Sequence, residues 1–332
     1  MPFTAQYDIA ILLPQINPDN YERSKVRYQG LSDEIHTLGF TACFAHSQVS
    51  YDADTSTFEA VTDAEHSQLA AHAAVKVVRD LTMPKNPDLA DLYNDVNRPA
   101  LVHAPALNDF LRNKADVFAL APEIHPITVV VSHEDVAEAV AATPGSRVIV
   151  KPVTGMAGKG VELREKHSQC SEPQPGGYLV QEYVDSSEGM PEFGVTGTHN
   201  IRIISIGSKA IGAIARINPE QNDMLKNDVY GAYIDPDTLP NTMKSIVDRV
   251  HEVLSKLAGS GSNVIAIDVM RGRDSSGKVV DKLCEVNRRP QRISLWDAMG
   301  KEAKRNTDLP GIRKLAKQWD IAEAELLVSR VR

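Results

Sequence analysis

An α/β fold is predicted by three features of the sequence: short apolar runs that alternate with helical patterns, a β-hairpin pattern near the C-terminus, and an ordinary globular composition. The chain has 332 residues, of which 42% are hydrophobic and 24% charged, which is enough for two or three domains. Its net charge of -8 argues against general nucleic-acid binding. No apolar run approaches the roughly 20 residues of a membrane helix, so we expect no membrane partner.

The start of the chain predicts a βαβ unit. Asp8 to Leu13 is an apolar run, residues 20–38 have a helical pattern, and Phe40 to Ala45 can form the next strand. The first β–α loop has no glycines, so a dinucleotide-binding fingerprint is absent. We expect a small open α/β domain over residues 1–104. Its other predicted elements are two helices and a strand, at 63–81, 88–97 and 100–103.

A second set of elements follows, and a glycine-rich loop interrupts it. The predicted order is helix, strand, helix, strand and strand, at 107–121, 127–131, 132–144, 147–151 and 178–184. The loop reads K-P-V-T-G-M-A-G-K-G-V from Lys151, and its glycines would let backbone N–H groups approach phosphate oxygens. Lys151 and Lys159 add positive charge. The loop is neither a P-loop nor G-x-G-x-x-G, and a flexible hairpin loop is the alternative.

The third region contains another predicted hairpin, from Asn200 to Arg216, which turns at Gly207. Its geometry brings Arg202 and Arg216 together at the open end, where they would suit a carboxylate or a phosphate; two surface arginines are the alternative. Three further segments are predicted as a loop, an amphipathic core helix and a charged helical tail that caps the surface, at 218–233, 241–258 and 301–332.

The hairpin between Val264 and Ser294 carries the main chemical prediction. A turn between Ser276 and Gly277 places Asp268 opposite Glu285, with Cβ atoms about 5 Å apart. Two carboxylates so close repel, so the register slips, one acid is protonated, or a cation lies between them. Asn287 adds an amide oxygen on the same face, and an all-oxygen set suits Mg²⁺ better than Zn²⁺. A solvated strand face is the alternative.

The three cysteines are far apart and lack metal-site spacing. Reduced thiols are the simplest interpretation, and the N-terminus has no signal-peptide pattern, so we expect a cytoplasmic protein. Cys284 alternates onto the apolar face of its strand together with Val286, which predicts a core position.

The order of these features resembles the ATP-grasp superfamily, and its glutathione synthetase and α-L-glutamate ligase branch is the most similar. The features are a helix lysine, strand-Lys-Pro with a glycine-rich loop, V-Q-E-Y-V, an x-x-R hairpin, and Asp followed by Glu-x-Asn on paired strands. The resemblance covers residues 105–300. It implies two lobes that clamp ATP after the small α/β domain, at 105–184 and 185–332.

The resemblance also implies roles for individual residues. Phosphate contacts would come from Lys114 and Lys151, with the loop from Thr154 to Gly160 (Thr154, Gly155, Met156, Ala157, Gly158, Lys159 and Gly160) closing over them. The adenine hinge would be Gln181, Glu182, Tyr183 and Val184, and the ribose would bind Asp185 or Glu188. Mg²⁺, or Mn²⁺ in its place, would bind Asp268, Glu285 and Asn287. The catalytic residues would be Arg202, Arg216 and Lys151.

Two positions depart from the branch. Asn200 replaces an acidic residue that is common two positions before the hairpin arginine. After Glu-x-Asn, the run Arg288-Arg289-Pro290-Gln291-Arg292 replaces a small residue and Pro-Gly. The additional positive charge favours an acidic, carboxylate-rich or phosphate-bearing acceptor.

The activity that the resemblance implies is that of an ADP-forming carboxylate–amine ligase with an acyl-phosphate intermediate. Its substrates would be a small-molecule or peptide carboxylate and an amine, and a homodimer is left open. A kinase on the same fold and a non-catalytic ATP-binding regulatory module are the alternatives.

Overall fold

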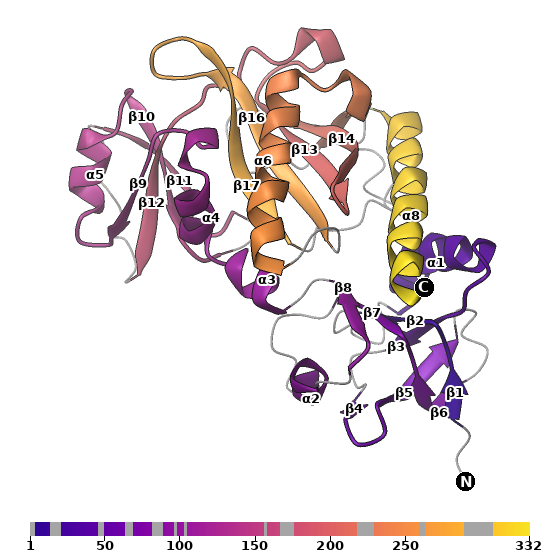
Figure 1. Ribbon diagram of the computed structural model, residues 1–332. Coiled ribbons are helices and arrows are strands. Elements are labelled where there is room, and N and C mark those ends of the chain that lie inside the picture. Colours follow the sequence, from indigo (N-terminus) through magenta and orange to yellow (C-terminus); the bar gives the residue numbers. More distant parts are fainter. Residues whose placement is uncertain are drawn as a thin grey trace.

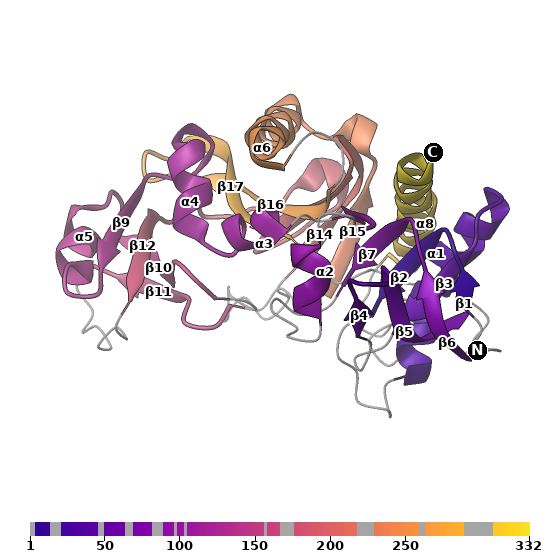
Figure 2. The same cartoon turned by 60° about the horizontal axis from the view of Figure 1, so that its bottom comes forward.

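The computed structural model describes most of the chain: residues 4–13, 21–45, 50–63, 69–81, 89–95, 98–102, 105–155, 158–166, 176–217, 229–258, 263–288 and 308–332. These residues form three sheets of eight, four and five strands. The five-stranded sheet lies between the other two, with the N-terminal sheet at one end of the molecule and the four-stranded sheet at the other (Figures 1 and 2).

The eight-stranded sheet contains the predicted βαβ unit. β2 (Ile9–Leu12) and β3 (Ala42–Ala45) are parallel, and α1 (Tyr21–Thr37) connects them. The strand order is β1-β6-β5-β3-β2-β7-β8, and β4 pairs with β5. The remaining elements are β1 (Thr4–Gln6), β4 (Tyr51–Asp52), β5 (Thr57–Asp63), β6 (Leu69–Ala74), β7 (Val77–Asp80), α2 (Ala90–Asn94) and β8 (Ala100–Val102).

The helix expected over 63–81 is wrong. That segment supplies the end of β5 and all of β6 and β7. Its alanines favour a helix by propensity, but β6 pairs with β1 on one side and β5 on the other, and this tertiary pairing overrides a weak local preference. The expected helix at 88–97 forms as the shorter α2, and the strand at 100–103 forms as β8.

The four-stranded antiparallel sheet has the order β11-β10-β12-β9. This part of the chain contains, in order, α3 (Pro105–Phe110), α4 (Lys114–Leu120), η3 (Pro122–Ile124), β9 (Thr128–Ser132), α5 (Val136–Ala142), β10 (Arg147–Pro152), β11 (Glu162–Glu165) and β12 (Gly177–Glu182). The helix expected over 107–121 is two helices, because Asn113 has extended backbone and caps α4 by accepting from the N–H of Ala115 at 3.0 Å. One face of the sheet packs on α5 through Val148, Val150 and Val180.

The five-stranded antiparallel sheet has the order β15-β14-β13-β16-β17. This part of the chain contains, in order, η4 (Pro191–Phe193), β13 (His199–Ile206), β14 (Lys209–Ile217), β15 (Val229–Ile234), η5 (Pro236–Thr238), α6 (Asn241–Ala258), β16 (Val264–Arg273) and β17 (Val279–Asn287). The amphipathic helix over 241–258 is confirmed as α6. The expected loop over 218–233 is wrong at its end, where β15 pairs with β14, and residues 218–228 lie outside the described residues.

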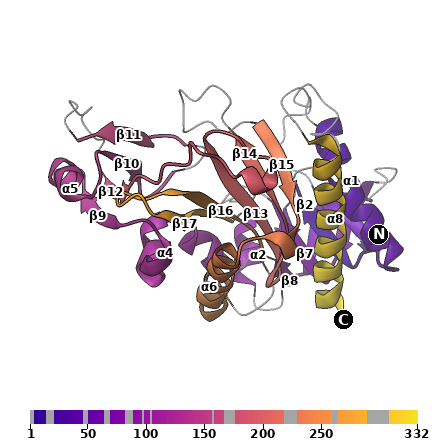
Figure 3. The same cartoon turned by 90° about the horizontal axis from the view of Figure 1, so that it is seen from above.

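The last helix, α8 (Leu309–Val331), is not the surface cap that we expected from its charged sequence. Its side chains include Leu315, Trp319 and Leu327, which are at most 1% exposed. They join one core with the N-terminal sheet and with one face of the five-stranded sheet, while α6 packs on the other face (Figure 3). The core side of α8 also carries charged residues, because Asp320 and Glu323 are 8% and 1% exposed. No helix in the described ranges is long and apolar enough to cross a membrane.

Candidate active site

Asp268 and Glu285 are cross-strand partners, as predicted, but a β-bulge produces the pairing. Near the turn the register pairs Arg273 with Val279, and it shifts by one residue between Asp268 and Val269. Cys284 is the extra residue of the bulge. Because the bulge changes the alternation, the core prediction for Cys284 is wrong: it is half-buried, and its neighbour Leu283 faces the core instead.

Two arginines converge on Asp268, which is 3% exposed. Arg202 lies directly opposite Asp268 on β13 and donates from Nε to Oδ1 and from Nη2 to Oδ2, both at 2.8 Å. Arg216 donates from Nη2 to Oδ2 at 2.9 Å. Burial raises the pKa of this carboxyl, but the charges and hydrogen bonds of the arginines outweigh burial and hold it below its ordinary value. Asp268 is therefore ionised at neutral pH.

Amide side chains complete this cluster. Asn287 donates from Nδ2 to Oδ2 of Asp268 at 3.0 Å. Asn200 accepts from Nε of Arg216 at 3.0 Å, so the residue that departs from the acidic pattern of the branch orients the arginine without neutralising it. The arginines predicted from the hairpin are thus brought together, on one carboxylate.

Glu285 lies beside two lysines from the four-stranded lobe. Its carboxylate is 3.5 Å from Nζ of Lys114, which also donates to the carbonyl of Gly155 at 2.8 Å. Lys151 is 6% exposed, and its Nζ donates to the carbonyl of Cys284, in the bulge, at 3.0 Å. Burial lowers the pKa of the Lys151 ammonium, against the opposing influence of Glu285. The bulge therefore also links the two lobes at the predicted site.

The glycine-rich loop begins next to these lysines. Thr154 forms an isolated bridge with Asn113, and Thr154, Gly155 and the segment Gly158 to Gly160, with Lys159, are exposed. Gly160 has φ +72°, and a Cβ there would lie 2.9 Å from Pro152, so glycine is required. Met156 and Ala157 lie outside the described residues.

The predicted hinge residues form the end of β12 and the two positions after it, and they are buried. Gln181 donates to Oγ1 of Thr128 at 2.7 Å, and Glu182 accepts from the N–H of Ser275, in the β16–β17 turn, at 2.8 Å. Tyr183 and Val184 are 8% and 3% exposed. Burial raises the pKa of the Tyr183 hydroxyl to about 12. The hinge thus contacts the tip of the hairpin that carries Asp268 and Glu285.

Sequence reasoning missed Arg147, which organises the end of the hinge. Its guanidinium lies 4.3 Å from the ring centroid of Tyr183 and donates to Oδ2 of Asp185 at 3.0 Å. Burial raises the pKa of Asp185, but hydrogen bonds from Ser187 and the charge of Arg147 bring it below its ordinary value. Glu188 accepts from Nε of Arg273 at 2.7 Å. Strand alternation offered a clue, since positions 147 and 151 of β10 share a face.

The oxygen set fits a hard divalent cation. Asp268 Oδ2 accepts from three N–H groups, but Oδ1 accepts only one among the described residues, and Glu285 has only the distant lysine. Within the described ranges no three His, Cys, Asp or Glu side chains gather to hold a metal ion, so softer metals have no cluster there. Mg²⁺ usually binds only a few protein oxygen atoms, and two carboxylates and an amide would supply such a set.

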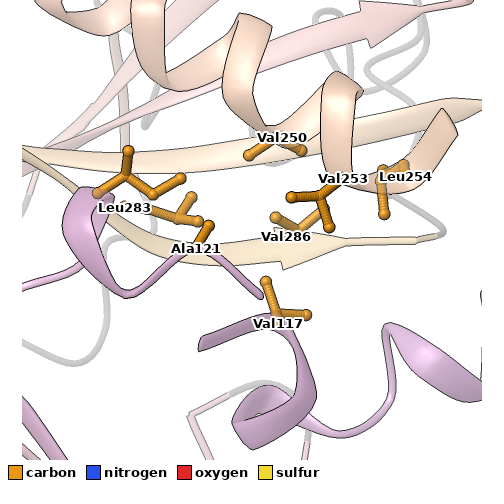
Figure 4. Close-up of a pocket in the computed structure, with 8 residues that line it drawn as sticks. Val117, Ala121, Val250, Val253, Leu254, Leu283 and Val286 are labelled. Carbon is orange, nitrogen blue, oxygen red and sulfur yellow. The ribbon is translucent and has the colours of Figure 1, made fainter. Parts of the chain in front are cut away.

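A pocket lies on the face of β17 that is opposite to Glu285 and Asn287. It is an apolar crevice of about 220 Å³, including space open to solvent, between α4, α6 and β17, and it is lined by residues such as Val117, Val250, Leu283 and Val286 (Figure 4). Leu283 and Val286 face the core, opposite in direction to Glu285 and Asn287. Its lining offers no polar group for phosphate or metal binding.

A four-stranded sheet with a glycine-rich loop, next to a five-stranded sheet whose hairpin carries paired acids, is the arrangement expected of an ATP-grasp protein. Residues 115–287, more than half of the chain, match the family of the prokaryotic glutathione synthetase ATP-grasp domain. The chain belongs to this family. No curated protein sequence matches the chain significantly.

Solved structures share the whole architecture. The D-cycloserine synthetase DcsG is 13% identical, covers 98% of this chain and 99% of its own, and gives a TM-score of 0.57. The D-alanyl-alanine synthetase A of Vibrio cholerae is 13% identical over 98% of this chain and 97% of its own, with a TM-score of 0.56. The ATP-grasp ligase PsnB, complexed with a minimal precursor, Mg and ADP, is 15% identical over 98% and 97%, with a TM-score of 0.54. Identities this low establish the fold alone.

Proposed function

We propose that this protein is an ATP-dependent, ADP-forming carboxylate–amine ligase. One observation carries the proposal: four cationic side chains, Lys114, Lys151, Arg202 and Arg216, converge on the hairpin face with Asp268 and Glu285. Four positive groups against two carboxylates leave a net charge of two positive units. Such a site favours phosphate oxygens and the negative charge that develops during phosphoryl transfer.

The reaction proceeds in two balanced steps. A carboxylate oxygen of the acid attacks the γ-phosphorus of ATP, the bond to the β-phosphate oxygen breaks, and ADP leaves. The amine nitrogen then attacks the carbonyl carbon of the acyl-phosphate, the carbon–oxygen bond breaks, and phosphate and one amine proton are released. Neither step needs a side-chain nucleophile. Closure of the loop from Thr154 to Gly160 would keep water from the acyl-phosphate.

The residues of this chain divide the work by position. Lys114 and Lys151 would hold ATP phosphates from the four-stranded lobe, and Arg202 and Arg216 would bind the transferred phosphoryl group and the acyl-phosphate from the five-stranded sheet. The hinge from Gln181 to Val184 would meet the adenine. Asp185 or Glu188 would accept hydrogen bonds from the ribose hydroxyls. Each carboxylate would do so while it keeps its ion pair, with Arg147 and Arg273 respectively.

Mg²⁺, with Mn²⁺ as an alternative ion, would be held by Asp268, Glu285 and Asn287 and would neutralise phosphate charge. The complex of PsnB with Mg and ADP supports this assignment, although that ligase is only 15% identical. We also propose the domain division given above, with a small-molecule or peptide acid and an amine as substrates.

The test is ADP release with Mg²⁺-ATP against pools of amino acids and dipeptides. A ligase releases ADP only when two substrates are present, and mass spectrometry then detects an amide. The Glu285→Ala variant should abolish ADP release, because it removes a carboxylate that would bind Mg²⁺. The fold should tolerate the change, because this side chain is part-exposed.

The matched control is Glu138→Ala, which removes an exposed carboxylate on α5. It should leave ADP release unchanged. Release with a single substrate and a stable phosphorylated product would replace the ligase with a kinase. Binding of ATP without release under any substrate pool would favour the regulatory module.

A further inference from the structure

An arginine is buried at the carboxyl end of a strand in the N-terminal sheet. Arg79 is the third residue of β7, which is parallel to its neighbours β2 and β8. Its side chain is 3% exposed, and Nε donates to Oε1 of Glu323, on α8, at 2.6 Å. Trp319 donates from its ring nitrogen to the other oxygen of Glu323 at 2.8 Å. Both carboxylate oxygens of Glu323 thus have a hydrogen-bond donor, and one of these donors is Nε of Arg79.

One donor of the guanidinium, Nη1, lacks a hydrogen-bond partner among the described residues. This atom of Arg79 is buried. An unsatisfied buried donor destabilises a folded protein, and a charged donor does so more strongly. The two Nη atoms of a guanidinium present parallel N–H groups that match the two oxygens of a carboxylate. A carboxylate bound there would satisfy the group.

The direction of α8 shows which way this edge of the sheet points. At its C-terminus, Arg332 lies over the ring of Phe40, at the amino end of β3, at 5.6 Å. Glu323, earlier in α8, lies at the carboxyl end of β7. The residue before α8, Asp308, accepts from the N–H of Tyr233, in β15, at 2.9 Å. The carboxyl ends of the parallel strands therefore point toward the five-stranded sheet, as α8 spans the two sheets (Figure 1).

A shared core connects this arginine with the candidate active site. Val77 of β7 and Ala266 of β16 belong to the same buried cluster. Arg79 lies two residues beyond Val77 on the same strand face, and Asp268 lies two residues beyond Ala266 on its strand face. In open α/β sheets, ligands bind at the carboxyl ends of the strands.

We propose that Arg79 binds a carboxylate of the amino-acid or peptide substrate, one that is not the reacting group. Glu323 and Trp319 position the guanidinium through its Nε edge. This assignment rests on the proposed ligase function, to which it adds the recognition of a carboxylate-bearing substrate by the N-terminal sheet.

The first test needs no turnover. The full chain is labelled with ¹⁵N-arginine, and the signal of Arg79 is identified by its loss in Arg79→Lys and by its shift in Glu323→Gln. Sodium acetate is titrated against sodium chloride at equal concentration. The Arg79 signal should move saturably with acetate and not with chloride; an equal response to both salts, or none, would overturn the proposal whether or not the protein is a ligase.

The second test uses the acid that supports ADP release. Arg79→Lys should raise the KM for that acid at least about tenfold, as expected for one charge-assisted contact, and leave the KM for ATP unchanged. Glu323→Gln removes the charge that positions Arg79, and Arg98→Lys is the control for an exposed arginine of the same sheet region. Glu323→Gln should lower the melting temperature with less effect on the KM. If both variants change the KM values for acid and ATP alike, the role is structural.

Discussion

Asp268 and Glu285 face one another across two strands, yet their surroundings differ. The side chain of Asp268 is 4% exposed and receives hydrogen bonds from two arginines and an amide. The side chain of Glu285 is 33% exposed, and its recorded ion pair is with Lys114 at 3.5 Å. The same strand pairing thus joins a buried carboxylate that accepts several hydrogen bonds and a part-exposed carboxylate with one long ion pair. The second carboxylate has oxygen lone pairs free to bind an added ion.

The difference assigns separate tasks to the two acids. Asp268 holds Arg202 and Arg216 in place by hydrogen bonds, and under the proposed function this would orient both guanidinium groups before substrate binds. Under the proposed function, Glu285 would bind the incoming Mg²⁺ ion. Arginine and lysine side chains beside the paired acids relieve their repulsion, and the shift in register at the bulge keeps the two acids opposite one another. The comparison predicts different consequences for stability and for activity.

The largest effect is expected for Asp268→Ala. The variant leaves the guanidinium groups of Arg202 and Arg216, which are 13% and 18% exposed, without their counter-charge. Breaking a buried ion pair in this way costs about 3–5 kcal/mol of unfolding free energy. Urea unfolding measures the change. A loss below about 1 kcal/mol would mean that Asp268 is no more integrated into the fold than Glu285.

Glu285→Gln should instead separate activity from stability. Its ion pair is long and part-exposed, so the unfolding free energy should change by less than about 1 kcal/mol. ADP release should fall at least about 100-fold, as for other losses of one group that stabilises transferred charge. Parallel unfolding and ADP-release assays check both values. A destabilisation as large as that of Asp268→Ala would remove the distinction between the two acids.

Lowering the pH separates the contribution of Asp268 to stability from that of a buried histidine, His125. Asp268 stays ionised down to its ordinary pKa of 3.8 because its pKa is lowered, whereas burial, followed by the charge of Lys151, lowers the pKa of His125 from 6.5 to about 3. Between these values the unfolded state binds the proton and the folded state does not. Stability is therefore full above pH 6.5 and falls as the pH drops toward 3, by at most about 1.4 kcal/mol per unit.

The variant His125→Phe should remove most of this acid loss. Both ring nitrogens of His125 are buried without partners among the described residues, and its ring already contacts Phe118 edge-on at 5.6 Å. Unfolding free energies at pH 7 and pH 5 give the comparison, with the more exposed His133→Phe as control. If the variant loses as much stability as the original protein, the acid response lies elsewhere.

The smallest effect is expected for Cys284→Ala. Lys151 donates to the backbone carbonyl of Cys284 and not to its thiol, and the side chain is only half-buried. The unfolding free energy should therefore change by less than about 1 kcal/mol, and ADP release by less than about twofold. The same two assays apply. A loss above about 2 kcal/mol would restore the core position that strand alternation predicted.

Local patterns in the sequence were enough to determine several parts of this protein. Short apolar runs identified β2 and β3, strand and turn patterns identified the two long hairpins, and apolar residues at helical spacing identified α6. The turn and the two-residue period predicted that Asp268 faces Glu285, although the pairing itself needs the bulge at Cys284. These features depend on residues that are close in sequence or on one hairpin, so their physics is visible in the chain order.

Only the tertiary structure decided the rest. The bulge at Cys284, the strands at 69–80 and the burial of α8 depend on partners distant in sequence, such as Lys151, β1 and the N-terminal sheet. The pairing of Arg79 with Glu323, 244 residues away, has no trace in local pattern. Local propensities amount to fractions of a kcal/mol per residue, whereas burial and ion-pair formation between distant segments are larger, so packing chose the outcome.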